Sequence, residues 1–181
     1  MTTTGRPPAL QITTRVAIPA RVDPALVLAA LHAYEPLIVA NPYLDRFERR
    51  AVPLGDLVGD AFFHDDGRDL QAFTVHDRVP LVAGLAKAVV VPCIFQAFDR
   101  GVRCRADAQW GVVVRSSYEV TPRGEVPPAA NEAWAGEWEL VETASIACGA
   151  LLRCFVKRSF TSAHQLILQR VVNEIARESG E

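Results

Sequence analysis

The stretch CGALLRCFVKRSFTSAHQLILQRVVNEIARE (residues 148–178) has apolar residues at helical spacing over most of its length. It predicts a helix of about 28 residues, about 40 Å long at the standard rise per residue. The stripe expected to face a sheet consists of Leu152, Val156, Ser159, Ala163, Leu166 and Ile167. Because the middle of this stripe is small, we expect room for a guest molecule between helix and sheet. The alternative is that bulky strand side chains fill the space, with Phe95, Phe98 and Trp138 as the candidates.

Upstream of this helix the sequence alternates in the manner of β-strands, beginning at residues 10–18. Two short helices follow, the first started by Asp23 and Pro24 and the second by Pro36. Further strands are predicted over 43–52, 70–80, 87–98, 101–109, 110–120 and 137–147. This order predicts an α+β fold of the helix-grip type, in which an antiparallel sheet wraps around a long C-terminal helix. We expect one domain over residues 1–181, with a disordered tail at 1–9 and a long loop at 122–136.

Composition limits the possible partners. The chain has 181 residues, is 50% hydrophobic and carries a formal net charge of −2, which fits one domain with a sizeable core. Its charges are scattered, so we expect no nucleic-acid partner. Neither a signal peptide nor an apolar run of membrane-spanning length is visible, and we expect a cytoplasmic protein. The cysteines lack metal-ligand spacing and are expected to be free core thiols, without metal or cofactor; they are Cys93, Cys104, Cys148 and Cys154.

A few polar residues share the apolar side of their strands and are therefore expected to face the cavity. The candidate catalytic residues are Gln96, Tyr118, Glu142 and Asp77. Glu142 is either a general base with a raised pKa or an ion-pair partner of Arg153 or Arg78. Tyr118 is either a donor to a substrate carbonyl or a satisfied core residue.

Gln96 cannot titrate, so it suits the orientation of a ligand better than acid or base work. The candidate ligand-binding residues are Phe73, Val75, Ile94, Phe98, Val112, Val114, Ser116, Trp138, Leu140, Val156, Ser159 and Ala163. The histidines are expected on surfaces of helices, loops or the outer side of a strand; they are His32, His64, His76 and His164.

Nucleophile, phosphate-binding and dinucleotide-binding motifs are all missing from the sequence. The remaining chemistry is what a shaped apolar cavity with a few hydrogen-bond donors performs. An intramolecular [4+2] cycloaddition needs little else, because preorganisation lowers the entropic barrier. An aldol-type cyclisation or dehydration with Glu142 or Asp77 as base and Tyr118 as donor is the second possibility. A carrier that releases an apolar ligand unchanged is the third.

The segments YEPLIVANPYLDRFERR, TVHDRVP and LVETASIACGALLRCFVKRSFTSAH resemble those of a fungal family of START-like (SRPBCC, polyketide-cyclase-like) proteins. The resemblance covers most of residues 10–175, and its landmarks are Asn41-Pro42, Asp77-Arg78, Cys148, Phe155-Val156 and His164. It implies an apolar polyketide or terpenoid ligand and a role in fungal secondary metabolism. Diels–Alderases that form norbornene rings are similar to the proteins of this family. It attaches no catalytic set to these landmarks.

KAVVVPCIFQAF (residues 87–98) is apolar on both faces, although a half-buried strand normally alternates. We expect one face to line the cavity. The other, with Val89, Val91, Cys93 and Phe95, then needs a cover, either the 122–136 loop or a second copy of the chain. An outer stripe of the last helix, Cys154, Leu168, Val172 and Ile175, is a second candidate contact of a possible homodimer.

Overall fold

The structure is a computed structural model that describes residues 8–57, 60–64, 69–80, 85–124 and 137–179. Strand β1 (Leu10–Ile18) is followed by helices α1 (Pro24–Ala33) and α2 (Glu35–Val39), strand β2 (Leu44–Arg50) and the short helix α3 (Leu54–Leu57). The strands β3 (Leu70–Pro80), β4 (Ala86–Phe98), β5 (Gly101–Ala108), β6 (Val112–Pro122) and β7 (Trp138–Ala147) come next. A 3-10 turn η2 (Gln109–Gly111) joins β5 to β6, and η3 (Ala150–Leu152) leads into α4 (Arg153–Glu178).

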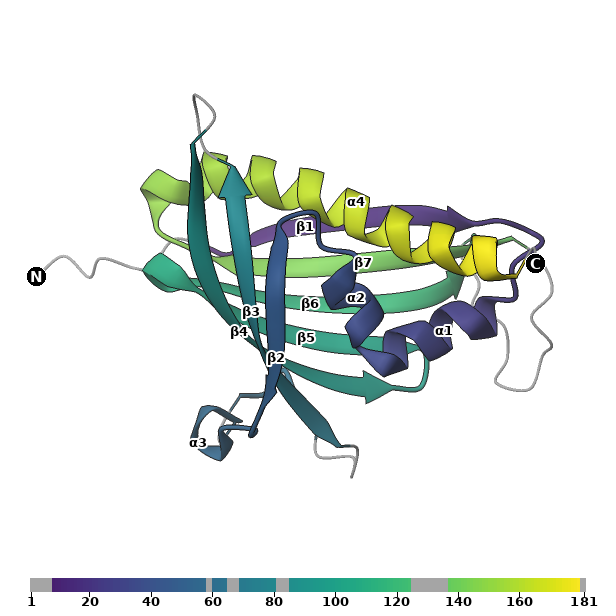
Figure 1. Cartoon of the computed structure of the whole chain (residues 1–181), viewed down its shortest axis with the longest axis horizontal. Helices are drawn as coiled ribbons and strands as arrows, with labels where there is room; N and C mark the ends of the chain where they lie inside the picture. Colours follow the sequence, from purple (N-terminus) through teal and green to yellow (C-terminus); the bar gives the residue numbers. More distant parts are fainter. Residues whose placement is uncertain (1–7, 58–59, 65–68, 81–84, 125–136, 180–181) are drawn as a thin grey trace, which may run out of the picture.

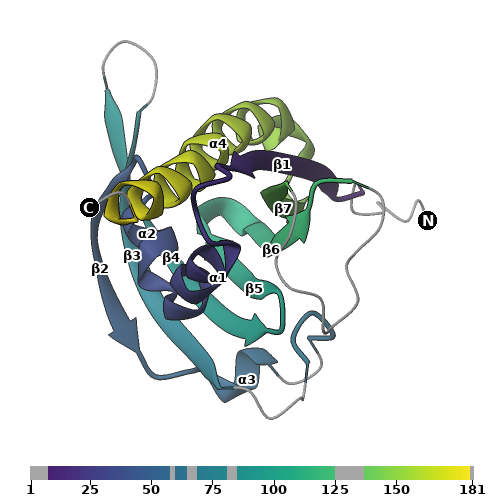
Figure 2. The same cartoon turned by 90° about the vertical axis from the view of Figure 1, so that its right-hand side faces the viewer.

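All seven strands belong to one antiparallel sheet of order β1-β7-β6-β5-β4-β3-β2. The sheet curls, and α4 lies across its concave side with α1 and α2 beneath its C-terminal half (Figure 1, Figure 2). The predicted helix-grip fold is therefore confirmed. The expected tail and loop fall largely outside the described residues, which omit 1–7 and 125–136, and β6 continues through Pro122.

Local sequence explains how the two short helices begin and end. The Asp23 side chain accepts a hydrogen bond of 2.9 Å from the Ala25 N–H, which caps α1 beside Pro24. Tyr34 ends α1 and starts α2 with φ of 62°, a left-handed conformation that is costly for a large residue. Its hydroxyl accepts a 3.1 Å hydrogen bond from the Ala97 N–H, and its ring packs 5.5 Å from Phe95. These contacts hold the strained residue in place.

Most of the core lies between the concave side of the sheet and the helices. Phe73 and Phe95 from neighbouring strands meet edge to face at 5.8 Å, and Leu168 and Val172 of α4 are completely or almost completely buried in the same cluster. A smaller cluster beneath the start of α4 contains Ile12, Ile146 and Phe160. Apolar side chains do not fill the space between these two clusters, and this space is the cavity described below.

Strand β4 is buried on both faces from Cys93 to Gln96, but the inward face is the opposite of the one predicted. Val89 and Val91 line the space beneath α4, and Cys93 and Phe95 share their side. The residues predicted to point inward, Ile94, Gln96 and Phe98, lie on the outer face. A period-two pattern that is apolar on both sides does not tell inside from outside, and the expectation for these three residues was wrong.

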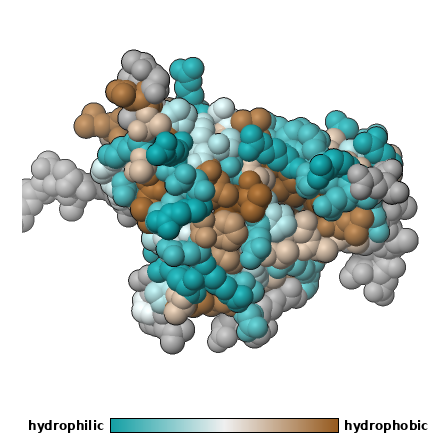
Figure 3. All heavy atoms as spheres, viewed as in Figure 1, coloured by the Kyte–Doolittle hydropathy of each residue, from teal (hydrophilic) through white to brown (hydrophobic). Residues whose placement is uncertain are grey.

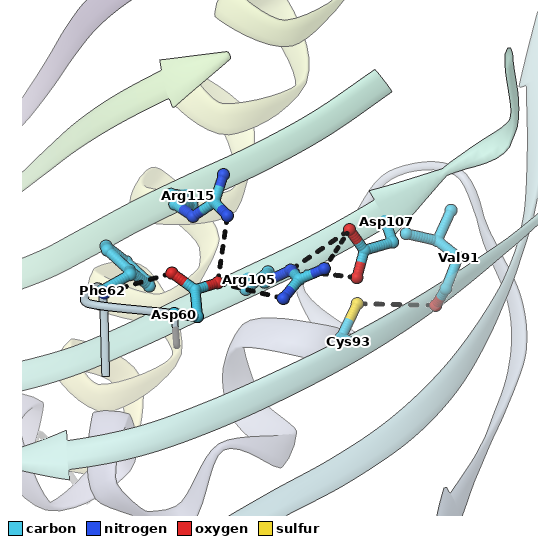
Figure 4. A network of polar contacts seen from close by, with 7 residues as sticks. All are labelled: Asp60, Phe62, Val91, Cys93, Arg105, Asp107 and Arg115. Atoms are coloured by element: carbon cyan, nitrogen blue, oxygen red, sulfur yellow. Dashed lines mark hydrogen bonds and ion pairs between the residues drawn. The ribbon is translucent and has the colours of Figure 1, made fainter. Parts of the chain in front are cut away.

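Segment 60–64 covers part of the outer face of β4. The Gln96 side chain accepts a 2.9 Å hydrogen bond from the His64 N–H and donates one of 2.5 Å to the His64 carbonyl. Asp60 Oδ2 accepts hydrogen bonds of 3.0 Å from both Arg105 and Arg115, which stand on adjacent strands (Figure 4). Gln96 therefore attaches this segment to the sheet.

Helix α4 is rotated slightly from the predicted orientation. Leu166, expected to face the sheet, is exposed, whereas Leu168, Val172 and Ile175 of the expected outer stripe are buried. The cause is that α1 and α2 contact the C-terminal half of α4 and cover that stripe. The homodimer stays a prediction, but these residues no longer argue for it.

Cys154 is exposed, which corrects its assignment to the core. The other three cysteines are buried, and all four are free.

Candidate functional site

A cavity of about 240 Å³ lies between the N-terminal half of α4 and the concave side of the sheet. Its lining is mostly aliphatic, with valines from β3, β4 and β6 and with Leu152, Val156 and Ile167 on the helix side. Within the described residues, the polar groups that reach it are Asn41, Tyr43, Asp77, Lys87, Gln109, Trp110, Ser159 and His164. An apolar space with a few polar groups is the usual form of a small-molecule site.

A larger groove of about 830 Å³ lies between α2 and the C-terminal part of α4. Much of its polar lining consists of exposed charged side chains, Glu35, Arg170, Glu174, Arg177 and Glu178. Exposed charges of both signs are typical of a solvated surface. We therefore place the chemistry in the smaller cavity.

A buried carboxylate stands behind one wall of this cavity. Glu142 on β7 is completely buried, and Ser116 on the neighbouring strand β6 donates a 2.6 Å hydrogen bond to its Oε1. His164 Nδ1 on α4 lies 2.8 Å and 2.9 Å from the two carboxylate oxygens. The predicted partners of Glu142, Arg153 and Arg78, are thus replaced by Ser116 and His164. A buried charge requires such partners, because isolated burial is very costly.

The His164 ring is fixed on a second side by Phe160, one helical turn earlier. The two rings stack with centroids 3.6 Å apart and an interplanar angle of 18°. Because both near acceptors of Nδ1 are carboxylate oxygens, we assign the ring proton to Nδ1. This assignment leaves Nε2 as the nitrogen with a free lone pair, on a residue that lines the cavity. A histidine oriented by a carboxylate is the usual arrangement of a general base.

Tyr118 belongs to the same cluster and does not line the cavity. Its hydroxyl lies 3.4 Å from His164 Nδ1. Burial raises the pKa of Tyr118 well above its ordinary value, and the nearby Glu142 charge adds to the shift. The hydroxyl therefore stays protonated and supports the Glu142–His164 pair, which agrees with the core interpretation of Tyr118.

Asp77 reaches the cavity from β3, on the sheet side. Its Oδ1 accepts a 2.8 Å hydrogen bond from Asn41 Nδ2, and Asn41 Oδ1 in turn accepts one of 3.0 Å from the Tyr43 N–H. Burial raises the pKa of Asp77, against the lowering effects of the Asn41 hydrogen bond and of charge on His164 and His76. Asp77 therefore keeps its proton to a higher pH than an exposed aspartate, and a protonated carboxyl is a hydrogen-bond donor.

The structure separates the predicted site residues into three groups. Of the predicted ligand-binding residues, Val112, Val114, Val156, Ser159 and Ala163 line the cavity. Phe73, Val75, Trp138 and Leu140 lie in the adjoining core, and Ser116 is turned to Glu142. Gln96, Ile94 and Phe98 lie on the outer face of the sheet and do not reach the cavity. Among the predicted catalytic residues, Asp77 alone lines it, with Glu142 and Tyr118 one layer behind.

His164 was predicted to lie on a surface, so the predicted set of site residues did not include it. Its side chain is partly buried, and it is next to Ala163 in the stripe that faces the sheet. The spacing of four between Phe160 and His164 was the available signal, because residues at that spacing share a helix face. The motif landmarks Asn41, Asp77 and His164, far apart in sequence, meet at this one cavity.

A family model described as a domain of unknown function (DUF7053) matches residues 9–177. The chain belongs to this family. No curated protein matches its sequence. Among solved structures, the protein TTHA0849 from Thermus thermophilus is 14% identical with a TM-score of 0.63, over 94% of this chain and 99% of that one.

Two further structures come from proteins described as aromatase/cyclases. The di-domain ARO/CYC StfQ from the steffimycin biosynthetic pathway is 9% identical, with a TM-score of 0.65 over 96% of this chain and 53% of that one. The Zhui aromatase/cyclase from Streptomyces sp. R1128 is 14% identical, with a TM-score of 0.53 over 93% of this chain and 94% of that one. At these identities the likeness shows a shared helix-grip fold. Among the described residues, no helix is both long and apolar enough to cross a bilayer.

Proposed function

We propose that the DUF7053 chain binds an apolar small molecule in the α4 cavity and catalyses the closure of a ring in it. The observation that carries the proposal is the buried Glu142–His164 pair at the wall of a mostly aliphatic cavity. A simple apolar carrier has no need of a fully buried carboxylate beneath a histidine, because such a pair is expensive to bury. The aromatase/cyclases with the same fold support cyclisation as the reaction class.

The pair favours proton transfer as the means of ring closure. His164 Nε2 accepts a proton from a carbon next to a substrate carbonyl, and Glu142 stabilises the imidazolium that forms. The resulting enolate carbon attacks a second carbonyl of the same molecule, forming the new carbon–carbon bond. The oxygen of the second carbonyl takes up a proton, either from the His164 imidazolium or from Asp77, whose pKa burial raises above that of an exposed aspartate. The product is a cyclic isomer, and loss of its new hydroxyl as water gives the dehydrated ring.

An intramolecular [4+2] cycloaddition in fungal secondary metabolism, the reaction expected first from the sequence, is the second candidate. The aliphatic lining supports it, because folding a flexible polyene needs shape more than charge. The volume of about 240 Å³ lies below the usual range of about 300–1,000 Å³ for ligand pockets, which favours a compact substrate over a large terpenoid. We therefore rank an acid–base cyclase of a small polyketide-like carbonyl compound first.

The two reactions differ in one bond. An aldol-type closure breaks a carbon–hydrogen bond next to a carbonyl, whereas a [4+2] cycloaddition breaks none. A hydrophobic metabolite extract with deuterium at its carbon-bound positions is therefore incubated with the protein in H₂O, and a converted component is followed by mass spectrometry. Acid–base closure predicts that the product loses one carbon-bound deuterium and that this loss depends on His164, whereas a cycloaddition predicts that all of them are retained.

Substitution of Glu142 gives an independent test. Glu142→Gln keeps the shape and a hydrogen bond to His164 but removes the charge that stabilises an imidazolium. Proton transfer predicts a loss of turnover of about 10²-fold or more, the usual contribution of a positioned acid or base. Near-normal turnover in this variant would support the cycloaddition instead. A ligand that is bound and released unchanged by the unmodified protein would support the carrier and remove both reactions.

A further inference from the structure

Exposed hydrophobic side chains stand in three turns beside residues that line the α4 cavity, at the end that we call its mouth. Leu151 in η3 is 99% exposed, Trp110 in η2 is 59% exposed and Leu85 before β4 is 66% exposed. Phe155 on the first turn of α4 is 46% exposed and, with Trp110, borders the cavity itself. Figure 3 shows hydrophobic surface at the end of the molecule where the β3–β4 hairpin and the start of α4 lie. Isolated exposed apolar residues are ordinary, but four around one opening form a surface.

Basic side chains accompany these residues. The stretch from Thr143 to Asn173 contains no acidic residue, and its cations at the start of α4 are Arg153, Lys157 and Arg158. Lys87 of β4 lies over the Trp110 ring, with its nitrogen 3.9 Å from the centroid, and also borders the cavity. The acids of α4 begin at Glu174, at the opposite end of the helix. The end of the molecule with the cavity mouth therefore combines apolar tips with positive charge.

We propose that this end of the molecule docks on the surface of an anionic lipid bilayer, where the cavity exchanges its apolar guest with the lipid phase. Leucine and phenylalanine at turn tips insert among acyl chains, tryptophan favours the headgroup level, and lysine and arginine attract anionic headgroups. Trp110 supports the assignment through its backbone as well. Its φ of 62° is unfavourable for a large residue and is followed by Gly111 at φ of 71°, which places the indole at an exposed tip of the β5–β6 turn.

The inference rests on the proposed function in one respect, that the guest is apolar. It does not depend on the reaction, and the two are tested separately. Vesicle binding is measured on the full chain without any guest, and guest binding is measured without vesicles. A chain that binds a guest but no vesicles would keep the proposed function and overturn the docking surface.

The experiment is co-sedimentation with vesicles of phosphatidylcholine alone and of phosphatidylcholine with phosphatidylserine. The unmodified protein is expected to bind the anionic vesicles more tightly and to lose this binding as salt rises. Leu151→Glu is expected to weaken binding about tenfold, because it removes an inserting side chain and adds a repelled charge. Leu166→Glu is the matched control, since Leu166 is also an exposed leucine but lies in the second half of α4, away from Leu151 and the start of the helix.

A second pair of variants tests the charge. Lys157→Glu at the mouth end is expected to weaken binding to anionic vesicles severalfold, whereas Arg177→Glu at the far end of α4 leaves it unchanged. Both side chains are exposed, so both variants are expected to fold. Failure of the unmodified protein to bind anionic vesicles would overturn the proposal and point to a protein partner at this surface. Equal effects of the mouth and control variants would also overturn it.

Discussion

His164 Nδ1 lies within 2.9 Å of both carboxylate oxygens of Glu142, and this contact joins helix α4 to strand β7 at the wall of the cavity. Ser116 and Tyr118 complete the surroundings of the carboxylate from strand β6. The pair is thus both a structural connection and the candidate base.

Glu142→Gln is expected to lower the free energy of unfolding by about 1–3 kcal/mol, because a charged hydrogen-bond acceptor is replaced in a buried network. Urea unfolding measures the change, with the exposed Glu178→Gln as control. The variant should stay folded, so any loss of turnover then reports on chemistry rather than on unfolding. A free energy equal to that of the control variant would show that the carboxylate charge has no structural role.

Ser159→Leu is expected to abolish the binding of an apolar guest while the protein remains folded. Ser159 lines the cavity, and a leucine there occupies a large part of its volume of about 240 Å³. Ser162→Leu, on an exposed position of the same helix, should leave binding unchanged. Titration with a fluorescent dye of low polarity measures both variants. Normal dye binding by Ser159→Leu would place the binding site elsewhere.

Asp77→Asn is expected to change how stability depends on pH. Burial raises the pKa of Asp77 in the folded state above its unfolded value of about 3.9, so the folded protein binds this proton more tightly. Its contribution to stability is therefore present below that unfolded value and is lost as pH rises through the folded pKa. The variant should gain stability relative to the unmodified protein near neutral pH but not near pH 3. An advantage that is independent of pH would contradict this assignment.

Asp60→Asn tests the cover on the outer face of the sheet. Burial alone would raise the pKa of Asp60, but hydrogen bonds from Arg115 and the Phe62 N–H, with the charges of Arg115 and Arg105, lower it overall. The stabilisation is thus present above the ordinary aspartate pKa and lost as pH falls through the folded value. The variant should lose about 1–2 kcal/mol at neutral pH, and less in acid, when unfolding is followed by circular dichroism. Equal losses at both pH values would contradict the ion-pair account.

Gly101→Ala tests the close approach of β5 to β6. A Cβ atom at Gly101 would lie 1.8 Å from the Tyr118 carbonyl oxygen, so the backbone must shift. The expected loss is about 3 kcal/mol, at the upper end of overpacking effects. Gly149→Ala is the matched control, because its added Cβ meets nothing within 4 Å. Thermal unfolding of both variants measures the difference, and similar melting temperatures would show that the strands are not so closely paired.

The sequence predicts this fold well because its periodicities are strong where one face is wet. Strand β1 alternates cleanly, Asp23 and Pro24 mark the start of α1, and all seven strands lie where the pattern places them. The pattern fails at β4, where Val89 and Gln96 lie on opposite faces that are both covered. Which face is inside depends on segment 60–64, a non-local contact that strand periodicity does not encode.

The site was predicted only in part, because some of its contacts also join residues that are far apart in the sequence. Glu142 and Asp77 were found because they interrupt apolar strand faces. His164 was missed because a helix surface usually carries polar residues, and its neighbour in space is 22 residues earlier in the chain. Asn41 was noted as a landmark without a role, and its contact with Asp77 depends on the Asn-Pro turn packing against β3.

The most direct measurement of the central claim is native mass spectrometry of the protein with a hydrophobic metabolite extract, followed over time beside Glu142→Gln and Ser159→Leu. The account predicts a bound species that the unmodified protein converts to an isomer or to a product lighter by one water. Glu142→Gln should retain that species largely unconverted, and Ser159→Leu should not bind it. A species that is released unchanged, or that the Ser159→Leu variant binds equally well, would contradict the account.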